Sequence, residues 1–126
     1  MAHFILEYSG NLAGELDVPA LFRELHATAM ETGVFPVGGI RFRAVRCDDY
    51  LIADGNPDNA FVHLSMKMGH GRTLAVRKDV GEKLFTTLCA VLDPIFQRRP
   101  FGISFEISEL GPELSFKKNN MHRGHP

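Results

Sequence analysis

The sequence predicts one α+β domain in which two β-α-β units share a four-stranded sheet, with both helices on one face. Three observations support this prediction. The chain of 126 residues is long enough for one domain with a buried core. Segments with the two-residue apolar alternation of strands flank a segment with helical spacing, and this order occurs twice. The two units span about residues 1–58 and 59–126, so the chain is one domain with an internal pseudo-repeat.

The first unit opens with an apolar segment at the very start of the chain. A strand is expected over residues 3–8, followed by a glycine-containing loop. Asp17 is a suitable N-cap for the helix that follows, Pro19 fits in its first turn, and Gly33 is a natural stop. Residues 40–47 alternate again and predict the second strand. The apolar side of the helix is expected to consist of Leu21, Phe22, Leu25 and Ala29.

The second unit repeats this order after a cluster of turn-forming residues. A short extra strand is expected before that cluster, around residues 50–52. Residues 59–68 and 101–109 alternate as strands, and Thr73 is a suitable N-cap for the long helix between them. Pro94 should kink this helix or begin a new turn. The apolar stripe of the helix is expected to contain Val80, Leu84, Leu88, Val91 and Ile95.

The arrangement of the two units determines which sheet face is covered. Each β-α-β unit needs parallel strands joined by a right-handed crossover, which brings both helices to one face. The opposite face is expected to be apolar and to need cover from other subunits, because a bare apolar face would form a large exposed patch. The tail from residue 111 onward is polar, and Leu114 and Phe116 are expected to anchor it.

The composition excludes several classes of function. A formal net charge of -1 argues against general nucleic-acid binding, which goes with an excess of basic residues. No apolar run approaches the length of a membrane span, and the short apolar start lacks the cationic leader of a signal peptide. Cys47 and Cys89 lack the spacing of metal ligands. We therefore expect a cytoplasmic protein with free thiols that binds neither nucleic acid nor membranes.

The amino terminus and two arginines are the first candidate site groups. A free α-amino group titrates at about 7.7–8.0, and neighbouring cations lower its pKa. The early apolar residues predict a terminus that is fixed in the sheet; an ordinary first strand with a solvated amine is the alternative. Arg41 and Arg43 share one face of a strand, about 7 Å apart, where they could grip a carboxylate. A solvated strand face is the alternative for this pair.

A third candidate is the loop Gly69-His70-Gly71-Arg72-Thr73, which joins a strand to the long helix. A helix N-terminus attracts anions, and Arg72 adds a full positive charge at the same point. A plain tight turn is the alternative. The six histidines do not converge as zinc ligands, so a metal site is not expected. His122 and His125 lie in the polar tail, where we expect them to be solvated.

Short segments spread over nearly the whole chain, in the right order, carry a resemblance to a known family. They are HFILE (3–7), TGVFP (32–36), GIRFR (39–43), ADG (53–55), AFVH (60–63), GR (71–72), SFEI (104–107) and FKKNN (116–120). On these segments the chain resembles the 5-carboxymethyl-2-hydroxymuconate isomerase family of the tautomerase superfamily, whose members are similar to macrophage migration inhibitory factor. The resemblance implies two β-α-β units per subunit and a homotrimer.

The resemblance also implies a reaction and its residues. The enzyme would move a proton along a conjugated hydroxy acid in homoprotocatechuate degradation, a route of aromatic compound catabolism. In this family an amino-terminal proline is the base, and arginines bind the carboxylates and stabilise developing negative charge. By position, Arg41 and Arg72 match the substrate arginines, with Arg43 as a third. The implied ligand is a small carboxylate, without metal or cofactor.

The chain departs from the family at the position of the base, where it has Ala2 in place of proline. Removal of Met1 is expected before so small a residue, which would make the primary amine of Ala2 the base. If Met1 stays, the amine is displaced by about 3.3 Å, one residue of strand. Three explanations remain open: an engineered replacement of proline, a relative with weakened or altered activity, or a different base. The alternative function is therefore a weakened or inactive trimer that binds an aromatic-derived acid.

Overall fold

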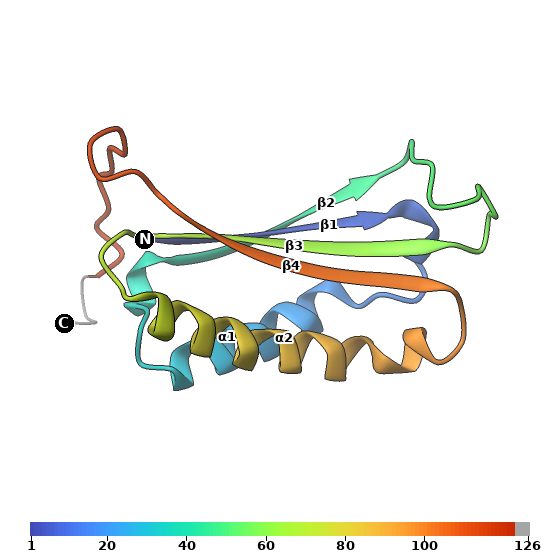
Figure 1. Cartoon of the computed structure of the whole chain (residues 1–126), viewed down its shortest axis with the longest axis horizontal. Coiled ribbons are helices and arrows are strands. Elements are labelled where there is room, and N and C mark those ends of the chain that lie inside the picture. Colours follow the sequence, from blue (N-terminus) through green and yellow to red (C-terminus); the bar gives the residue numbers. More distant parts are fainter. Residues whose placement is uncertain (123–126) are drawn as a thin grey trace.

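The computed structural model describes residues 1–122 of the chain. Its elements follow the order strand, helix, strand, twice over, with two short 3-10 helices in the connections (Figure 1). The predicted pair of β-α-β units is therefore confirmed. The elements are β1 (Ala2–Ser9), η1 (Gly10–Leu12), α1 (Val18–Glu31), η2 (Val37–Gly39), β2 (Ile40–Cys47), β3 (Ala60–Met68), α2 (Leu74–Phe96) and β4 (Phe101–Glu109).

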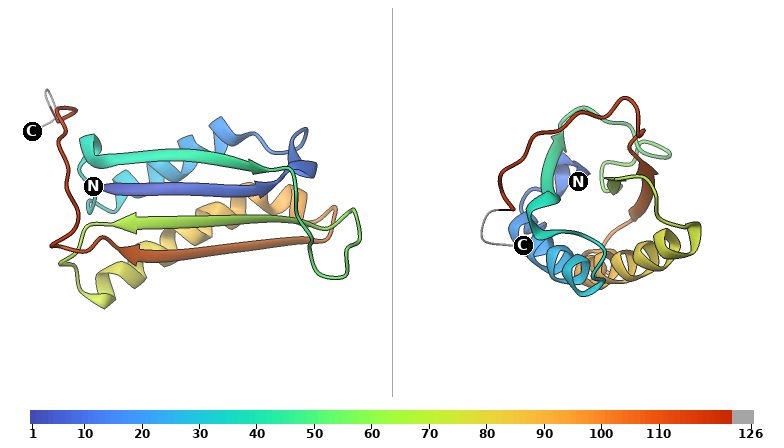
Figure 2. Two further views of the ribbon diagram at one scale, coloured as in Figure 1. Left: turned by 90° about the horizontal axis from the view of Figure 1, so that it is seen from above. Right: turned by 90° about the vertical axis from the view of Figure 1, so that its left-hand side faces the viewer.

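The four strands form one sheet in the order β2-β1-β3-β4. Within each unit the strands are parallel, and the two units meet where β1 runs antiparallel to β3. Both helices lie side by side beneath one face of the sheet, as Figures 1 and 2 show. β1 therefore starts at the end of the sheet where β2 also starts and where β3 and β4 finish. This topology decides which loops meet at the candidate site.

The core lies between the sheet and the two helices. Alternate residues of the central strands β1 and β3 are fully buried there, and each such Leu, Phe, Val or Met stabilises the fold by about 1.5–3 kcal/mol. The helix caps are those expected: Asp17 Oδ1 accepts a hydrogen bond from Ala20 N (3.1 Å), and Thr73 Oγ1 accepts one from Val76 N (3.2 Å). The largest fully buried side chains include Phe4, Leu6, Leu21, Leu25, Leu64, Met66, Leu84 and Leu88.

Two local predictions were wrong, and a third was incomplete. Residues 50–52 form no strand, because the chain leaves β2 through a turned segment in which Ala53 has a φ of 53° and which does not pair with the free outer edge of β2. The α2 stripe is buried at Val80, Leu84, Leu88 and Ile95 as predicted, and Val91 packs partly buried against the core, but the prediction omitted Leu92, which is 1% exposed. In the tail, Leu114 and Phe116 are 86% and 87% exposed, so neither anchors it in the single chain.

Pro94 lies inside α2, which continues through it and ends at Phe96 with Gln97 as its C-cap. The proline comes in the last turn, where few residues remain to be disrupted. The prediction that a new turn begins at Pro94 was therefore wrong. No helix among residues 1–122 combines the length and the apolar character that a membrane span requires.

The helix-free face of the sheet is mostly polar, which corrects the expectation of a bare apolar face. In the β1–β3 register, His3 lies opposite Lys67 and Glu7 lies opposite His63. The apolar residues of β4 are partly buried against the core, and its alternate positions are exposed. The residues of this face, by alternation from the buried ones, are His3, Ile5, Glu7, Arg41, Arg43, Val45, Phe61, His63, Ser65, Lys67, Gly102, Ser104, Glu106 and Ser108.

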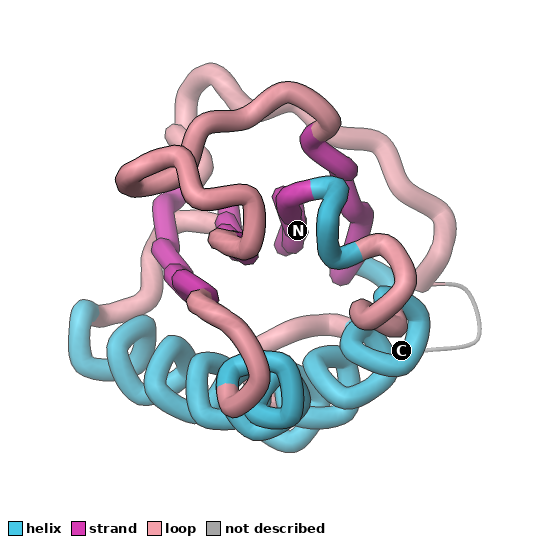
Figure 3. Tube along the Cα trace, turned by 90° about the vertical axis from the view of Figure 1, so that its right-hand side faces the viewer, coloured by secondary structure: helices cyan, strands magenta, loops and turns pink. Residues whose placement is uncertain are grey.

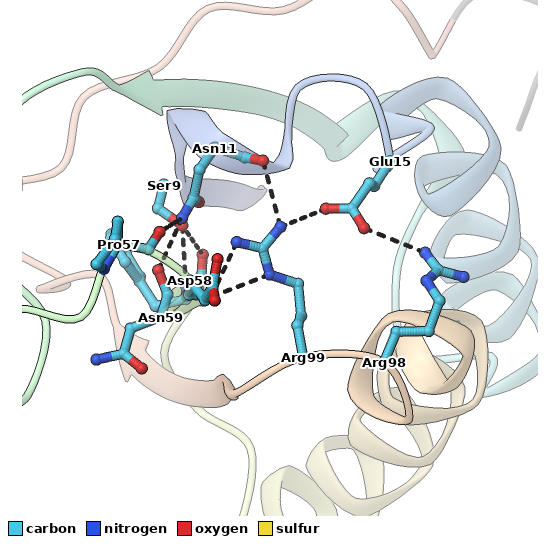
Figure 4. A network of polar contacts seen from close by, with 9 residues as sticks. Ser9, Asn11, Glu15, Pro57, Asp58, Asn59, Arg98 and Arg99 are labelled. Carbon is cyan, nitrogen blue, oxygen red and sulfur yellow. Dashed lines mark hydrogen bonds and ion pairs between the residues drawn. The ribbon is translucent and has the colours of Figure 1, made fainter.

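Loops close the end of the sheet where β1 and β2 finish, and Figure 3 views the molecule from this end. Arg99 lies among them, with a side chain that is only 16% exposed. It donates hydrogen bonds to Asp58 O (2.9 and 3.1 Å) and Asn11 O (3.4 Å), and it forms an ion pair with Glu15 (Figure 4). One cation therefore connects three segments that are far apart in the sequence.

Candidate active site

The α-amine of Met1 lies at the opposite end of the sheet, where the central strand β1 begins. Ala2 is 2% exposed, so the strand is buried from its first residue. Two glycines leave room for the terminus: a Cβ added at Gly39 would lie 3.5 Å from Met1 Cα, and one at Gly69 would lie 3.9 Å from the amine nitrogen. The predicted fixed terminus is therefore present, and it lies between one glycine that precedes β2 and another that follows β3.

Arg72 is held next to this amine by the backbone of two loops. Its Nη2 donates to Val34 O (2.8 Å), and its Nη1 donates to Gly69 O at a longer 3.4 Å. A Cβ added at Gly69 would lie 3.8 Å from Arg72 Nη1, so the same small space adjoins both the guanidinium and the amine. Gly71 permits this loop because its φ is 105°, which a residue with a side chain rarely adopts. The loop thus fixes the cation before any ligand arrives.

The positive charge around the terminus changes its protonation. Burial lowers the pKa of the Met1 α-amine below its ordinary value, and the charges of Lys117, Arg72 and Arg41 lower it further, in that order. More of the amine is therefore a free base near neutral pH than in an isolated peptide. A neutral amine among cations is the arrangement that a general base for an anionic substrate requires.

Arg41 and Arg43 share the helix-free face, as predicted, but they have different surroundings. Arg41 is partly buried and acts on the amine through its charge. The Nη1 of Arg43 lies 3.1 Å from Nδ1 of His3, further along the sheet. Burial, Arg41 and then Arg43 lower the pKa of His3, which favours its neutral form. The structure therefore brings Arg41 and Arg72 to the terminus and places Arg43 one pleat away.

Three cavities meet at Met1. A narrow one, of about 10 Å³, adjoins Ala2 and Arg72. A larger one, of about 310 Å³, is lined by Met1, Pro36, Gly39, Lys117, Asn119 and His122. The third, of about 170 Å³, lies between Met1, the loop after β3 and the tail. Two larger hollows have volumes of about 500 and 560 Å³, the first between the helices and the second between α2 and β4. Neither is lined by a predicted site residue, so cavity size alone would not identify the candidate site.

The profile of the family described as 5-carboxymethyl-2-hydroxymuconate isomerase matches residues 2–124 of the chain. The chain belongs to this family. It is 43% identical over 122 residues to 5-carboxymethyl-2-hydroxymuconate Delta-isomerase of Escherichia coli, and the match covers 97% of each chain. It is 39% identical to a crystal structure of a 5-carboxymethyl-2-hydroxymuconate isomerase from Deinococcus radiodurans R1, with a TM-score of 0.94 over 99% of this chain and 94% of the other.

More distant structures share the fold of this isomerase-family member. One is described as a W0 fused 4-OT wild type symmetric trimer (16% identity, TM-score 0.66, 88% of each chain). Another is a macrophage migration inhibitory factor-like protein from Entamoeba histolytica (14% identity, TM-score 0.55, 92% of this chain and 95% of the other). The predicted tautomerase-like fold is confirmed by this likeness, which at such identities concerns the fold alone.

Sequence reasoning did not find the tail residues that line the site of this family member. Lys117, Asn119 and His122 line the cavity beside Met1, although His122 was expected to be only solvated. Asn119 Nδ2 donates to Gly38 O (2.7 Å), which fixes the tail against η2. The FKKNN segment (116–120) was noted as part of the resemblance, but nothing in its pattern indicated where it lies. His125 lies outside the described residues.

Other titratable groups contribute no further candidate in the described part of this family member. Residues 1–122 contain no group of three or more His, Cys, Asp and Glu side chains placed to hold a metal ion. Both cysteines are free, and burial raises the pKa of the Cys89 thiol. Glu106 pairs with His63 at 3.3 Å.

Proposed function

We propose that the protein is an isomerase that moves a proton along an unsaturated, carboxylate-rich hydroxy acid of the 5-carboxymethyl-2-hydroxymuconate type. The observation that carries the proposal is an α-amine in a cavity that Arg72 also lines, with a pKa that burial and nearby cations, Arg41 among them, lower. The relative from Escherichia coli is named for this reaction, and the pathway would be the degradation of homoprotocatechuate. The molecule needs no metal or cofactor in this proposal.

The proton transfer uses the neutral amine as the base. It takes the proton from the 2-hydroxyl group of the substrate, and the resulting ammonium returns a proton at carbon 5, which leaves a ketone at carbon 2. Negative charge develops on the conjugated oxygen between these steps. Arg72, already oriented by Val34 O and Gly69 O, stabilises that charge without having to reorganise. Arg41 binds a neighbouring carboxylate, and the substrate-binding role expected for Arg43 stays a prediction.

The base in this proposal is the α-amine at the start of β1, which belongs to Ala2 once Met1 is removed. Loss of Met1 moves the amine by about 3.3 Å along the strand and frees the space between Gly39 and Gly69 for the substrate. A displacement of 1 Å can cost about a hundredfold in rate, so the two forms should differ strongly. Mass spectrometry of the intact protein tells which form is present.

The direct experiment mixes the protein with the hydroxymuconate acid and follows the loss of its ultraviolet absorbance. Arg41→Gln and Arg72→Gln should each lower kcat/KM, and Ala2→Pro should raise it sharply. Arg46→Gln is the matched control, because Arg46 lies on the same strand but is 52% exposed and paired with Asp48. If Ala2→Pro leaves the rate unchanged in protein that lacks Met1, the terminal amine is not the base.

A second function is favoured by Ala2 itself, since the family position holds proline. The protein would then be a weakened or inactive homologue that binds an aromatic-derived acid. In that case calorimetry should detect binding of the acid, and Arg41→Ala should weaken it, while the absorbance assay shows no acceleration at high protein concentration. Turnover by the unaltered protein would exclude this second function.

The proposal includes a homotrimer in the cytoplasm. A structure with the same fold is described as a symmetric trimer, and the outer edges of β2 and β4 pair with no other strand among residues 1–122. The two free cysteines are consistent with a reducing compartment. Light scattering coupled to size exclusion tests the assembly: a mass three times that of the chain is expected, and a monomer at all concentrations would contradict it.

A further inference from the structure

We propose that the cavity closed by the tail beside Met1 is a subsite for a second carboxylate group of the substrate, with Lys117 as its cation. The inference rests on the proposed function, because it concerns another part of the same substrate. The resemblance points to Arg41 and Arg72, and it assigns nothing to Lys117. The placement of Lys117 comes from the fold of the tail.

The tail crosses the open end of the sheet past the amino terminus, from the β4 side to the β2 side, as Figure 2 shows. It is fixed at both sides of this crossing. Leu110 N donates to Met68 O (2.7 Å), and Asn119 Nδ2 donates to Gly38 O (2.7 Å). Met121 N donates in turn to Asn119 Oδ1 (2.8 Å). Lys117 lies between these attachments, so its backbone is held over the site.

Lys117 borders two of the cavities that meet at Met1. It lines the cavity of about 310 Å³ with Asn119 and His122, and also the cavity of about 170 Å³ on the side of Gly69. Apart from Lys117 and Met1, the larger cavity is lined by polar or small residues and by no carboxylate among residues 1–122, so nothing in this lining repels an anion. A carboxylate-bearing arm that enters it from the reacting centre would reach Lys117 without displacing Arg72.

The charges at this position favour an anion. No acidic residue in the described part of the chain forms an ion pair with Lys117, Arg72 or Arg41. Three cations and an amine close together repel one another unless an anion lies among them. Lys117 also has the largest effect of any charge on the pKa of the amine, which agrees with its nearness. A substrate with several carboxylates could neutralise Lys117 and Arg41, while Arg72 faces the oxygen where charge develops.

The subsite predicts a division of roles between the cations. Arg72 acts at the oxygen where charge develops, so its loss should lower kcat. Lys117 binds an arm that does not change charge in the reaction, so its loss should mainly raise KM. A charged hydrogen bond of this kind corresponds to a change in KM of about 10-fold to 100-fold. Lys118, the next residue, lines none of the cavities described here and provides the matched control.

The test compares Lys117→Met, Lys117→Arg and Lys118→Met. Steady-state kinetics on the three-carboxylate hydroxymuconate should show a KM at least about tenfold higher in Lys117→Met, near-normal values in Lys117→Arg, and no change in Lys118→Met. The rising limb of kcat/KM should also move to higher pH in Lys117→Met, because a removed cation lets the pKa of the amine rise. An unchanged KM, or a loss confined to kcat, overturns the subsite.

A binding measurement separates this inference from the proposed function. Calorimetry with tricarballylate, a saturated three-carboxylate acid, needs no turnover and should show the same weakening in Lys117→Met. If the protein is inactive but binding depends on Lys117, the subsite stands and the isomerase proposal fails. If the protein is active and neither KM nor binding depends on Lys117, only the subsite fails.

Gly38→Ala gives a second variant that keeps Lys117 and moves the tail. A Cβ at Gly38 would lie 2.9 Å from the backbone of both Met121 and His122, so the tail would have to shift. We expect KM for the three-carboxylate substrate to rise in this variant as well. A normal KM would mean that the position of the tail does not matter to binding, which contradicts the proposal.

Discussion

Replacement of Arg99 by methionine should destabilise the fold by about 2–4 kcal/mol while leaving the candidate site intact. Arg99 connects the segment between β1 and α1, through Asn11 and Glu15, to the turn before β3, through Asp58 (Figure 4). It lies at the end of the sheet where β1 finishes, and the α-amine lies at the end where β1 starts. The substitution therefore separates stability from chemistry.

The magnitude follows from the contacts that would be lost. Two hydrogen bonds to Asp58 O are short, at 2.9 and 3.1 Å, and the one to Asn11 O is weaker at 3.4 Å. Hydrogen bonds that involve a charged group contribute about 1.5–3 kcal/mol each. Water can replace part of the lost hydrogen bonding, since Asp58 and Glu15 are exposed. The net loss in the free energy of unfolding is therefore about 2–4 kcal/mol.

Arg98 is the matched control for Arg99. Its side chain is 54% exposed, and its ion pair with the same Glu15 measures 3.4 Å. Arg98→Met should therefore cost less than about 1 kcal/mol, as exposed ion pairs do. Urea unfolding followed by circular dichroism gives both values. Equal free energies of unfolding for the two variants would refute the reasoning, as would a large loss of kcat/KM in folded Arg99→Met.

The pH dependence of the Arg99 effect has a definite sign. The hydrogen bond and charge of Arg99 lower the pKa of Glu15 in the folded state. A carboxyl group whose pKa is lower in the folded than in the unfolded chain stabilises the fold at pH values above its unfolded pKa of about 4.3. This stabilisation is lost as the pH falls through the pKa of the group in the folded chain. The difference in the free energy of unfolding between the unaltered protein and Arg99→Met should therefore become smaller at acidic pH. A constant difference down to the lowest measurable pH would contradict the role of Glu15.

Three further predictions concern the core, the turn before β3 and the site. Leu84→Ala should cost about 2–5 kcal/mol in urea unfolding, because Leu84 is fully buried between α2 and the sheet; a cost below about 1 kcal/mol would contradict that packing. Gly55→Ala should cost about 1–2 kcal/mol, since Gly55 has a φ of 85°, and Gly14→Ala is its control. Arg72→Gln should lower kcat/KM about 100-fold to 1,000-fold. It should also move the rising limb of the pH profile of kcat/KM to higher pH, because the pKa of the amine rises when this cation is removed. A rising limb at unchanged pH would show that the amine is not the titrating base.

The elements of the fold could be predicted because local patterns determine them. Residues 101–109 alternate without interruption, and β4 has these bounds. Asp17 and Thr73 cap the helices as their side-chain chemistry suggests. The pattern at residues 50–52 failed because a strand also needs a partner, and this segment turns away from the free edge of β2 instead of pairing with it. The predicted stripe of α2 omitted Leu92, which is 1% exposed, although it included Val91, which is partly buried against the core.

The candidate site could be predicted only in part, for a similar reason. Arg41 and Arg72 stood out because a strand face and a helix start are recognisable in sequence. Lys117 did not, because its segment has no periodicity and its position depends on hydrogen bonds to Met68 and Gly38, distant in the chain. The polar helix-free face was also missed, since alternation indicates that two faces differ without saying which of them the helices cover.

The topology explains why the cations collect at one end of the molecule. Parallel pairing makes β1 and β2 start together, and the antiparallel step makes β3 and β4 finish at that same end. Arg41 near the start of β2, Arg72 after β3 and Lys117 after β4 are therefore brought to the terminus of β1, although they are far apart in the sequence. At the other end of the sheet the same topology brings Glu15, Asp58 and Arg99 together. There Arg99 forms an ion pair with Glu15 and donates a hydrogen bond to the backbone carbonyl of Asp58. The cations around the amine have no such acidic partner within residues 1–122, and a carboxylate-rich substrate would supply it.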